Sequence, residues 1–145
     1  MVLTVEAGGT VVTVEQLHGK LRSGWREPAA LYTRAWCART PGADDRFVAV
    51  APGEDAPIKL RAPELPLGFA GWLARAEDAT RVRRRMAPAI GRLIDAARPL
   101  AVVGDDDIVV WARGLVDDEV RVRAMAELAA ALAIEPLGGG LGPYR

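Results

Sequence analysis

The sequence predicts an α+β fold, with a largely antiparallel sheet that carries two or three helices packed on one face. The first half of the chain holds short β-branched or alternating segments separated by turn residues, and the second half holds helical segments around a further hairpin. Strands that precede helices without strict alternation are typical of sheets whose helices gather on one face. We expect one domain over residues 1–134, β-rich over 1–61 and helix–hairpin–helix over 64–133, followed by a flexible Gly/Pro-rich tail over 135–145.

A β-hairpin is predicted at the N-terminus. Residues 3–7 and 10–14 are rich in β-branched side chains and flank Gly8 and Gly9, which adopt the positive φ angles of a tight turn without steric cost. The following segment, 16–28, contains two glycines and a proline, so we expect a loop with one short turn of helix.

Short strands are expected next. Residues 31–37 alternate at strand period, which places two sets of side chains on opposite faces: Leu31, Thr33, Ala35 and Cys37 on one, and Tyr32, Arg34 and Trp36 on the other. A turn is predicted at 41–45, a strand at 47–51, a second turn at 52–55 and a third short strand at 58–60.

Helices are predicted after Pro66. Residues 67–76 place Phe69, Trp72 and Leu73 at the i, i+3, i+4 spacing of a helix face. Asp78 or Thr80 then caps a longer helix. Pro88 lies inside its apolar stripe, so it either kinks this helix or begins a second one.

A second hairpin and a closing helix complete the chain. Residues 99–103 and 108–112 are apolar runs separated by the turn 104–107. Asp117 or Asp118 caps a final helix that runs to about residue 133. Its apolar face is predicted to hold Val120, Ala124, Leu128 and Ala131, widened by Met125 and Leu132.

The stretch from Asp45-Arg46-Phe47-Val48-Ala49-Val50 to the final helix resembles the soluble domain of uncharacterised bacterial proteins. The shared pattern is a Phe-x-Val strand, a helix, a Gly-Asp-x hairpin and a closing helix that follows an aspartate. The resemblance covers roughly two-thirds of the chain and implies an α+β fold with no assigned activity. Such proteins are often membrane-tethered, whereas this chain contains no apolar run long enough to span a bilayer.

Composition narrows the function classes. The chain of 145 residues carries 19 basic and 19 acidic side chains, so its net charge is zero, whereas nucleic-acid-binding domains are usually basic. His18 and Cys37 are the only residues of their kinds, which excludes an internal disulfide and leaves too few ligands for a Cys/His zinc site. We therefore expect a cytoplasmic protein with no metal and no cofactor.

The basic residues Arg81, Arg84, Arg85 and Arg92 are candidate anion-binding residues. On one helix they would lie near one another, and guanidinium groups pair well with the phosphates of nucleic acid or lipid headgroups. The competing interpretation is the solvated face of an amphipathic helix.

The four tryptophans Trp25, Trp36, Trp72 and Trp111 are candidate interface residues. Tryptophan is enriched in binding hot spots when it is exposed. The alternative is that these side chains anchor the core.

Three further features each have a structural and a functional interpretation. The acidic run 105–107 is a plain turn or a calcium site, although it lacks the spacing of a calcium loop. His18 is a structural residue, or a general base oriented by the nearby Glu15. Cys37 is a buried thiol or a reactive one, and Ser23 is the only serine available as a nucleophile, without the Gly-x-Ser-x-Gly pattern.

These observations favour a non-enzymatic protein–protein interaction or assembly module that either self-associates or binds a protein partner. The first alternative is anionic-ligand binding through the Arg-rich helix, which the zero net charge disfavours. The second alternative is an enzyme with a carboxylate or His18-based site.

Overall fold

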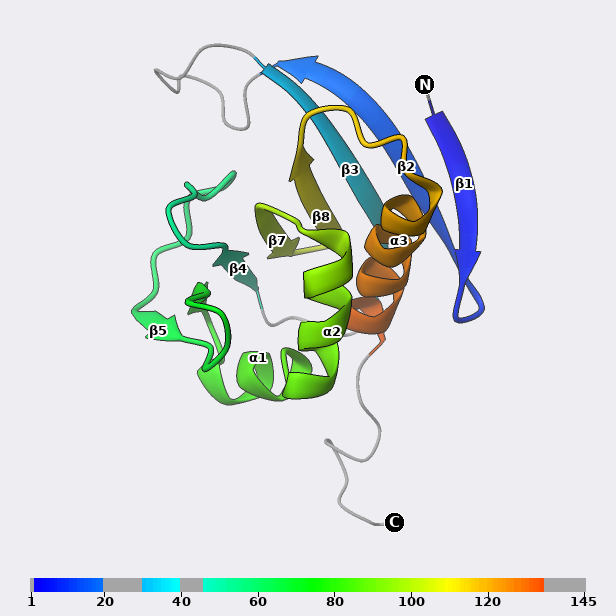
Figure 1. The fold of residues 1–145 in the computed structure, drawn as a ribbon. Helices are drawn as coiled ribbons and strands as arrows, with labels where there is room; N and C mark the ends of the chain where they lie inside the picture. Colours follow the sequence, from blue (N-terminus) through cyan, green and yellow to red (C-terminus); the bar gives the residue numbers. More distant parts are fainter. Residues whose placement is uncertain (1, 20–29, 40–45, 135–145) are drawn as a thin grey trace.

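The computed structural model describes residues 2–19, 30–39 and 46–134. Within these ranges all eight strands join one sheet in the order β1-β2-β3-β8-β7-β4-β6-β5, and every pairing is antiparallel. The elements are β1 Val2–Ala7, β2 Thr10–Gly19, β3 Ala30–Ala38, β4 Phe47–Val50, β5 Glu64–Pro66, β6 Leu73–Ala76, α1 Ala79–Arg85, α2 Pro88–Ala97, β7 Ala101–Gly104, β8 Asp107–Arg113 and α3 Glu119–Ala133 (Figure 1).

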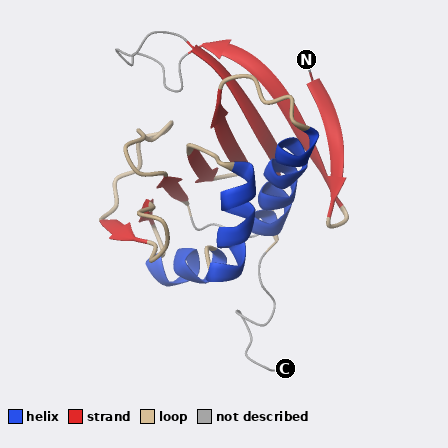
Figure 2. Ribbon diagram, viewed as in Figure 1, coloured by secondary structure: helices blue, strands red, loops and turns tan. Residues whose placement is uncertain are grey.

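The predicted α+β class is confirmed. Figure 2 shows the helices gathered on one side of the sheet, where α3 contacts strands β1, β2, β3 and β8 and also packs against α2. The main core fills the space between this helical layer and the sheet, with Phe47, Met125 and Leu128 among its fully buried side chains. Burial of this apolar surface is the main force that holds the layers together.

A smaller core lies on the opposite face of the sheet. Tyr32 and Trp111 pack there edge-to-face, with ring centroids 6.2 Å apart. The segment between β4 and β5 contributes Leu60 and Ile58 to this cluster. The sheet is therefore covered by helices on one side and partly by a loop segment on the other.

Both predicted hairpins form. Gly8 and Gly9 have φ angles of 56° and 78°, and Ala7 pairs with Thr10 across this two-residue turn. β7 and β8 pair in the second hairpin, as predicted. Strand β3 alternates as expected: Thr33, Ala35 and Cys37 are buried under the helices.

The helix starts also agree with the sequence. Asp78 caps α1 by accepting a hydrogen bond from Arg81 N, and Asp118 caps α3 by accepting one from Val120 N. Pro88 begins a second helix, because it occupies the first position of α2, where its missing N–H has no intrahelical partner to lose.

Three predicted segments were wrong. Residues 67–76 are not a helix: Leu67 N donates to Trp72 O across a turn in which Gly68, Ala70 and Gly71 have positive φ, and strand β6 follows. Residues 58–60 are not a strand, and the strand that follows β4 in the chain is β5. The helix was predicted wrongly because i, i+3, i+4 spacing in a short segment does not exclude a turn followed by a strand. Strands thus continue past residue 61, into the region expected to hold only helices and one hairpin.

The third segment predicted wrongly is 16–28, which was expected to be a loop with one short turn of helix. β2 continues through Gly19, because β3 offers a partner as far as Ala30. Residues 20–29 lie outside the described part of the chain, as do the predicted turn at 41–45 and the predicted tail at 135–145.

The predicted apolar face of α3 also needs correction. Val120 is 75% exposed and Ala131 is exposed, whereas Ala126, Ala129 and Ala133 are buried. α3 packs on the sheet and on α2 at the same time, so two of its sides are buried. Small alanine side chains allow both neighbours to approach closely, which a single apolar stripe does not reveal.

Candidate interaction surface

Strand β1 forms one edge of the sheet. Its inner side pairs with β2, and no described residue pairs with its outer side (Figure 1). The strand has six residues in unbroken register, and its side chains alternate between exposed and partly buried positions. Its first residue, Val2, is 66% exposed. The other edge, β5, has only three residues, of which the last is Pro66.

Edge strands of native proteins are usually protected by lysine, proline, a bulge or a covering element. β1 contains no lysine and no proline, and its continuous register leaves no room for a bulge. Glu6 is its one charged residue. The free backbone groups of β1 therefore form a template for another strand.

A groove runs between β1 and α3. One cavity of about 420 Å³ is lined by Leu3 and Val5 of β1 and by Val116 and Val122 on the helical side, with charged side chains at its rim. A second cavity of about 400 Å³ continues along the same helix, toward the Gly8 turn and the end of α3. We call the surface formed by Leu3, Val5, Val116 and Val122 the β1–α3 groove.

Charges of both signs border this groove. Glu119, Arg123 and Glu127 follow one another at i, i+4 spacing along the outer side of α3. Glu119 lines the first cavity, Glu127 lines the second and Arg123 lines both. Among the described residues, Glu119 and Arg123 form no ion pair. The rim is polar and the floor is apolar, which is the usual anatomy of a protein interface.

Two arginines hold the helical layer in place. Arg85, which is 4% exposed, donates from Nη1 to the carbonyl oxygen of Leu132 at 2.8 Å, near the C-terminus of α3. Arg121 donates from Nε to Ala97 O at 2.8 Å and from Nη2 to Arg98 O at 2.9 Å, at the C-terminus of α2. Partial burial, together with the nearby Arg98 charge, lowers the pKa of Arg121. A cation at a helix C-terminus satisfies free carbonyls and opposes the helix dipole.

The candidate anion-binding arginines are divided between two helices. Arg81, Arg84 and Arg85 lie on α1, and Arg92 lies on α2, because Pro88 separates the two. Arg84 and Arg92 are exposed and Arg81 is partly exposed, whereas Arg85 is buried against α3. The guanidinium of Arg85 is therefore a structural group, and anion binding through the other three stays a prediction.

The tryptophans do not form one exposed surface. Trp72 belongs to the main core and Trp111 to the smaller core on the other face. Trp36 is partly buried and lines a small hollow of about 180 Å³ with Arg34, on the sheet face opposite the helices. Trp25 lies outside the described residues. The core interpretation thus holds for Trp72 and Trp111.

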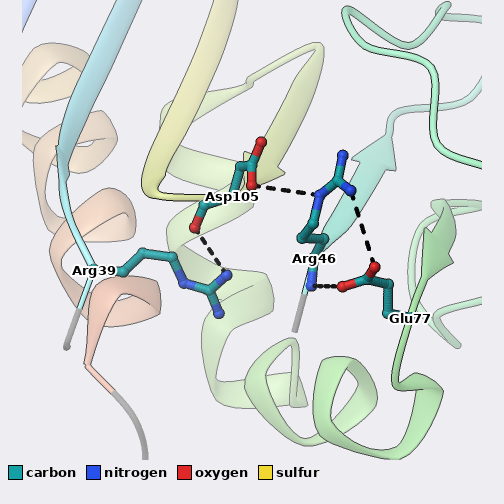
Figure 3. A network of polar contacts seen from close by, with 4 residues as sticks. All are labelled: Arg39, Arg46, Glu77 and Asp105. Carbon is teal, nitrogen blue, oxygen red and sulfur yellow. Dashed lines mark hydrogen bonds and ion pairs between the residues drawn. The ribbon is translucent and has the colours of Figure 1, made fainter. Parts of the chain in front are cut away.

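In the acidic run 105–107, Asp105 and Asp106 form the turn between β7 and β8, Asp107 begins β8, and the carboxylate of Asp105 is already paired. Arg46 Nε lies 3.4 Å from Asp105 Oδ1, and Arg46 N donates to Glu77 Oε1 at 3.0 Å (Figure 3). Arg39 donates from Nη1 to the carbonyl oxygen of Asp105 at 3.1 Å. These contacts tie the ends of β3, β4 and β6 to the β7–β8 turn. The described ranges contain no cluster of three side chains that could hold a metal ion.

His18 and Cys37 occupy different surroundings. His18 is exposed near the end of β2, and Glu15 faces the opposite side of that strand, where it pairs with Arg34. Glu15 therefore does not orient His18. Burial, with a smaller contribution from Asp107, raises the pKa of Cys37 to about 11, which describes an inert thiol. Ser23 lies outside the described residues.

The β1–α3 groove was not predicted from the sequence. The alternation of Val2–Ala7 and the absence of lysine and proline were visible in the sequence. The position of β1 at the sheet edge was not, because it depends on which strand pairs with which.

No family model and no curated protein matches this chain. Its fold is similar to that of the mycobacterial trehalose monomycolate transport factor A, TtfA, with a TM-score of 0.58 and 11% sequence identity over 94% of this chain and 74% of that chain. At this identity the likeness concerns the fold. No helix within the described ranges is long and apolar enough to cross a membrane.

Proposed function

We propose that this protein is a protein–protein interaction or assembly module that binds a β-strand of its partner along the outer edge of β1. The observation that carries the proposal is the exposed six-residue edge strand beside an apolar groove. In such strand addition, main-chain hydrogen bonds supply affinity and pockets for alternate side chains supply specificity.

The groove supplies the side-chain pocket that this mode requires. A strand added beside β1 would place every second side chain next to Leu3 and Val5, under the outer side of α3. The charged rim, with Glu119 and Arg123, would then contact the polar flanks of that strand. The structural neighbour is named as a transport factor, and this name supports a non-enzymatic role for the present chain.

The proposal is tested with a soluble peptide of seven alternating valine and threonine residues, flanked by lysines. Hydrogen–deuterium exchange should show slower exchange at the β1 amides when the peptide binds. A matched peptide with N-methyl groups on alternate residues should not bind, because it lacks the hydrogen-bond donors along one edge.

Two variants separate the groove from the rest of the hairpin. Val5→Lys places a charge in the groove and should weaken peptide binding at least about tenfold. Val11→Lys makes the same change at an exposed position of β2 that does not line the groove, and should leave binding unchanged. Equal binding of the N-methylated peptide, or no protection of β1, would contradict the proposal.

A further inference from the structure

We propose that the strand which adds to β1 is β1 of a second copy of this chain, so that two copies form a twofold-symmetric dimer with one continuous sheet. This inference rests on the proposed function and names its partner. The proposed register pairs residue i of one copy with residue 8 − i of the other, centred on Thr4.

The pairing of β1 with β2 fixes the direction in which the free backbone groups of β1 point. Ala7 pairs with Thr10 across the two-residue turn, which makes this pair the hydrogen-bonded end of the hairpin. Hydrogen-bonded and non-hydrogen-bonded pairs alternate along an antiparallel ladder, so Leu3 and Val5 also direct their N–H and C=O groups toward β2. The N–H and C=O groups of Val2, Thr4 and Glu6 therefore point outward.

The Thr4-centred register satisfies all of these outward groups. Thr4 exchanges both hydrogen bonds with Thr4 of the second copy, and Val2 exchanges both with Glu6 of the second copy, on either side of the axis. A register centred on Val5 would pair Thr4 with Glu6 and leave the outward groups of Val2 without a strand partner. Only one symmetric register within Val2–Ala7 thus uses the whole edge.

The side chains also match in this register. Antiparallel pairing about a twofold axis perpendicular to the sheet keeps the helices of both copies on the same face. Leu3 of each copy then lies opposite Val5 of the other, and the two Thr4 side chains lie opposite each other. Both kinds of cross-strand pair are favourable. No like charges face each other along the strand, since Glu6 lies opposite Val2.

The groove is centred on the same axis. Leu3 and Val5, which line its floor, flank Thr4 on either side. The twofold axis therefore joins the apolar grooves of the two copies into one. Each rim carries two acidic side chains, Asp117 and Glu119, and the basic Arg123, so the two rims together offer both signs of charge across the seam.

The first measurement is the molar mass by light scattering across a dilution series. The monomer mass is 15.5 kDa, and we expect twice that value at high concentration. Val5→Lys should raise the dimer dissociation constant at least about tenfold, because each interface would contain two buried lysines. Val11→Lys should leave it unchanged.

The second measurement maps the register with a short bifunctional thiol cross-linker. Two copies of the Thr4→Cys variant should cross-link with each other. The Val2→Cys variant and the Glu6→Cys variant should each give no cross-linked dimer alone, and should cross-link when the two variants are mixed. Hydrogen-bonded pairs in a ladder have Cα atoms about 5.5 Å apart, which is within reach of the reagent. Cys37 is buried in the wild-type chain and supplies the background control, and Val11→Cys is the exposed control outside the seam.

The outcomes separate this inference from the proposed function. A dimer with this cross-linking pattern supports both. A dimer with a different pattern overturns the β1–β1 register. A monomer at every concentration whose β1 still binds the valine–threonine peptide overturns the dimer but leaves the proposed function standing. A monomer that does not bind the peptide overturns both.

Discussion

Arg85 is expected to be one of the main contributors to the stability of this fold, although its sequence context marks it as a surface residue. The perturbation is Arg85→Met, which keeps an unbranched apolar side chain in the buried channel and removes the guanidinium. Three arginines at 83–85 in succession are typical of a solvated helix face, yet Arg85 is 4% exposed and reaches the C-terminus of α3.

The magnitude follows from the contacts. The bond from Arg85 Nη1 to Leu132 O is 2.8 Å long and buried, and a hydrogen bond with a charged partner contributes about 1.5–3 kcal/mol. The bond to Ile134 O, at 3.4 Å, lies beyond the usual range and adds little. A partly buried cation at a helix C-terminus contributes up to about 2 kcal/mol more. We expect Arg85→Met to lower the free energy of unfolding by about 2–4 kcal/mol.

Urea unfolding followed by circular dichroism measures this loss. With a slope of about 2 kcal/mol/M, the midpoint should fall by about 1–2 M while the slope stays constant. Arg92→Met is the matched control, because Arg92 is exposed on α2, and it should change stability by less than about 0.5 kcal/mol. If Arg85→Met were as stable as Arg92→Met, the structural role assigned to Arg85 would be refuted.

Four further predictions concern two glycines and the buried cysteine. Gly104→Ala should destabilise the fold by about 1–3 kcal/mol, because the new Cβ would lie 2.2 Å from Cε1 of the fully buried Phe47 ring. Gly19→Ala is the control, because the space around its Cβ is open, and it should not destabilise the fold. Thermal unfolding of both variants measures the difference. Gly91→Ala should stabilise by about 0.5–1 kcal/mol, since nothing outside α2 lies within 4 Å of the new Cβ, and an unchanged or lower urea midpoint would contradict this. Cys37 should react with a thiol reagent at pH 8 far more slowly in the folded than in the urea-unfolded chain, because its pKa is raised to about 11 by burial. Since the unfolded thiol loses its proton first, stability should also fall as the pH rises from about 9 toward 11, and a flat urea midpoint over that range would contradict the raised value.

Much of the local structure could be predicted from the sequence. The Gly8-Gly9 turn, the alternation of β3 and the aspartate caps of α1 and α3 each depend on residues within a few positions of one another. Backbone preferences and capping hydrogen bonds act over that short range, so one sequence contains the whole signal.

Features that depend on contacts between distant segments could not be predicted in the same way. The helix expected at 67–76 failed because β4 offers β6 a strand partner, and β4 lies more than twenty residues earlier in the chain. The two-sided burial of α3 required both the sheet and α2. Arg85 was expected on the surface because its acceptor, Leu132, is 47 residues away.

The sequence by itself determined the α+β class, the hairpins and the helix starts, and its low content of cysteine and histidine disfavours a zinc site. The tertiary structure alone decided which strand lies at the edge of the sheet and which arginine is buried. It also decided that Leu3 and Val5 share an open groove with Val122. The reason is physical: local patterns fix the conformation of a segment, whereas an edge, a groove and a buried charge exist only relative to distant neighbours.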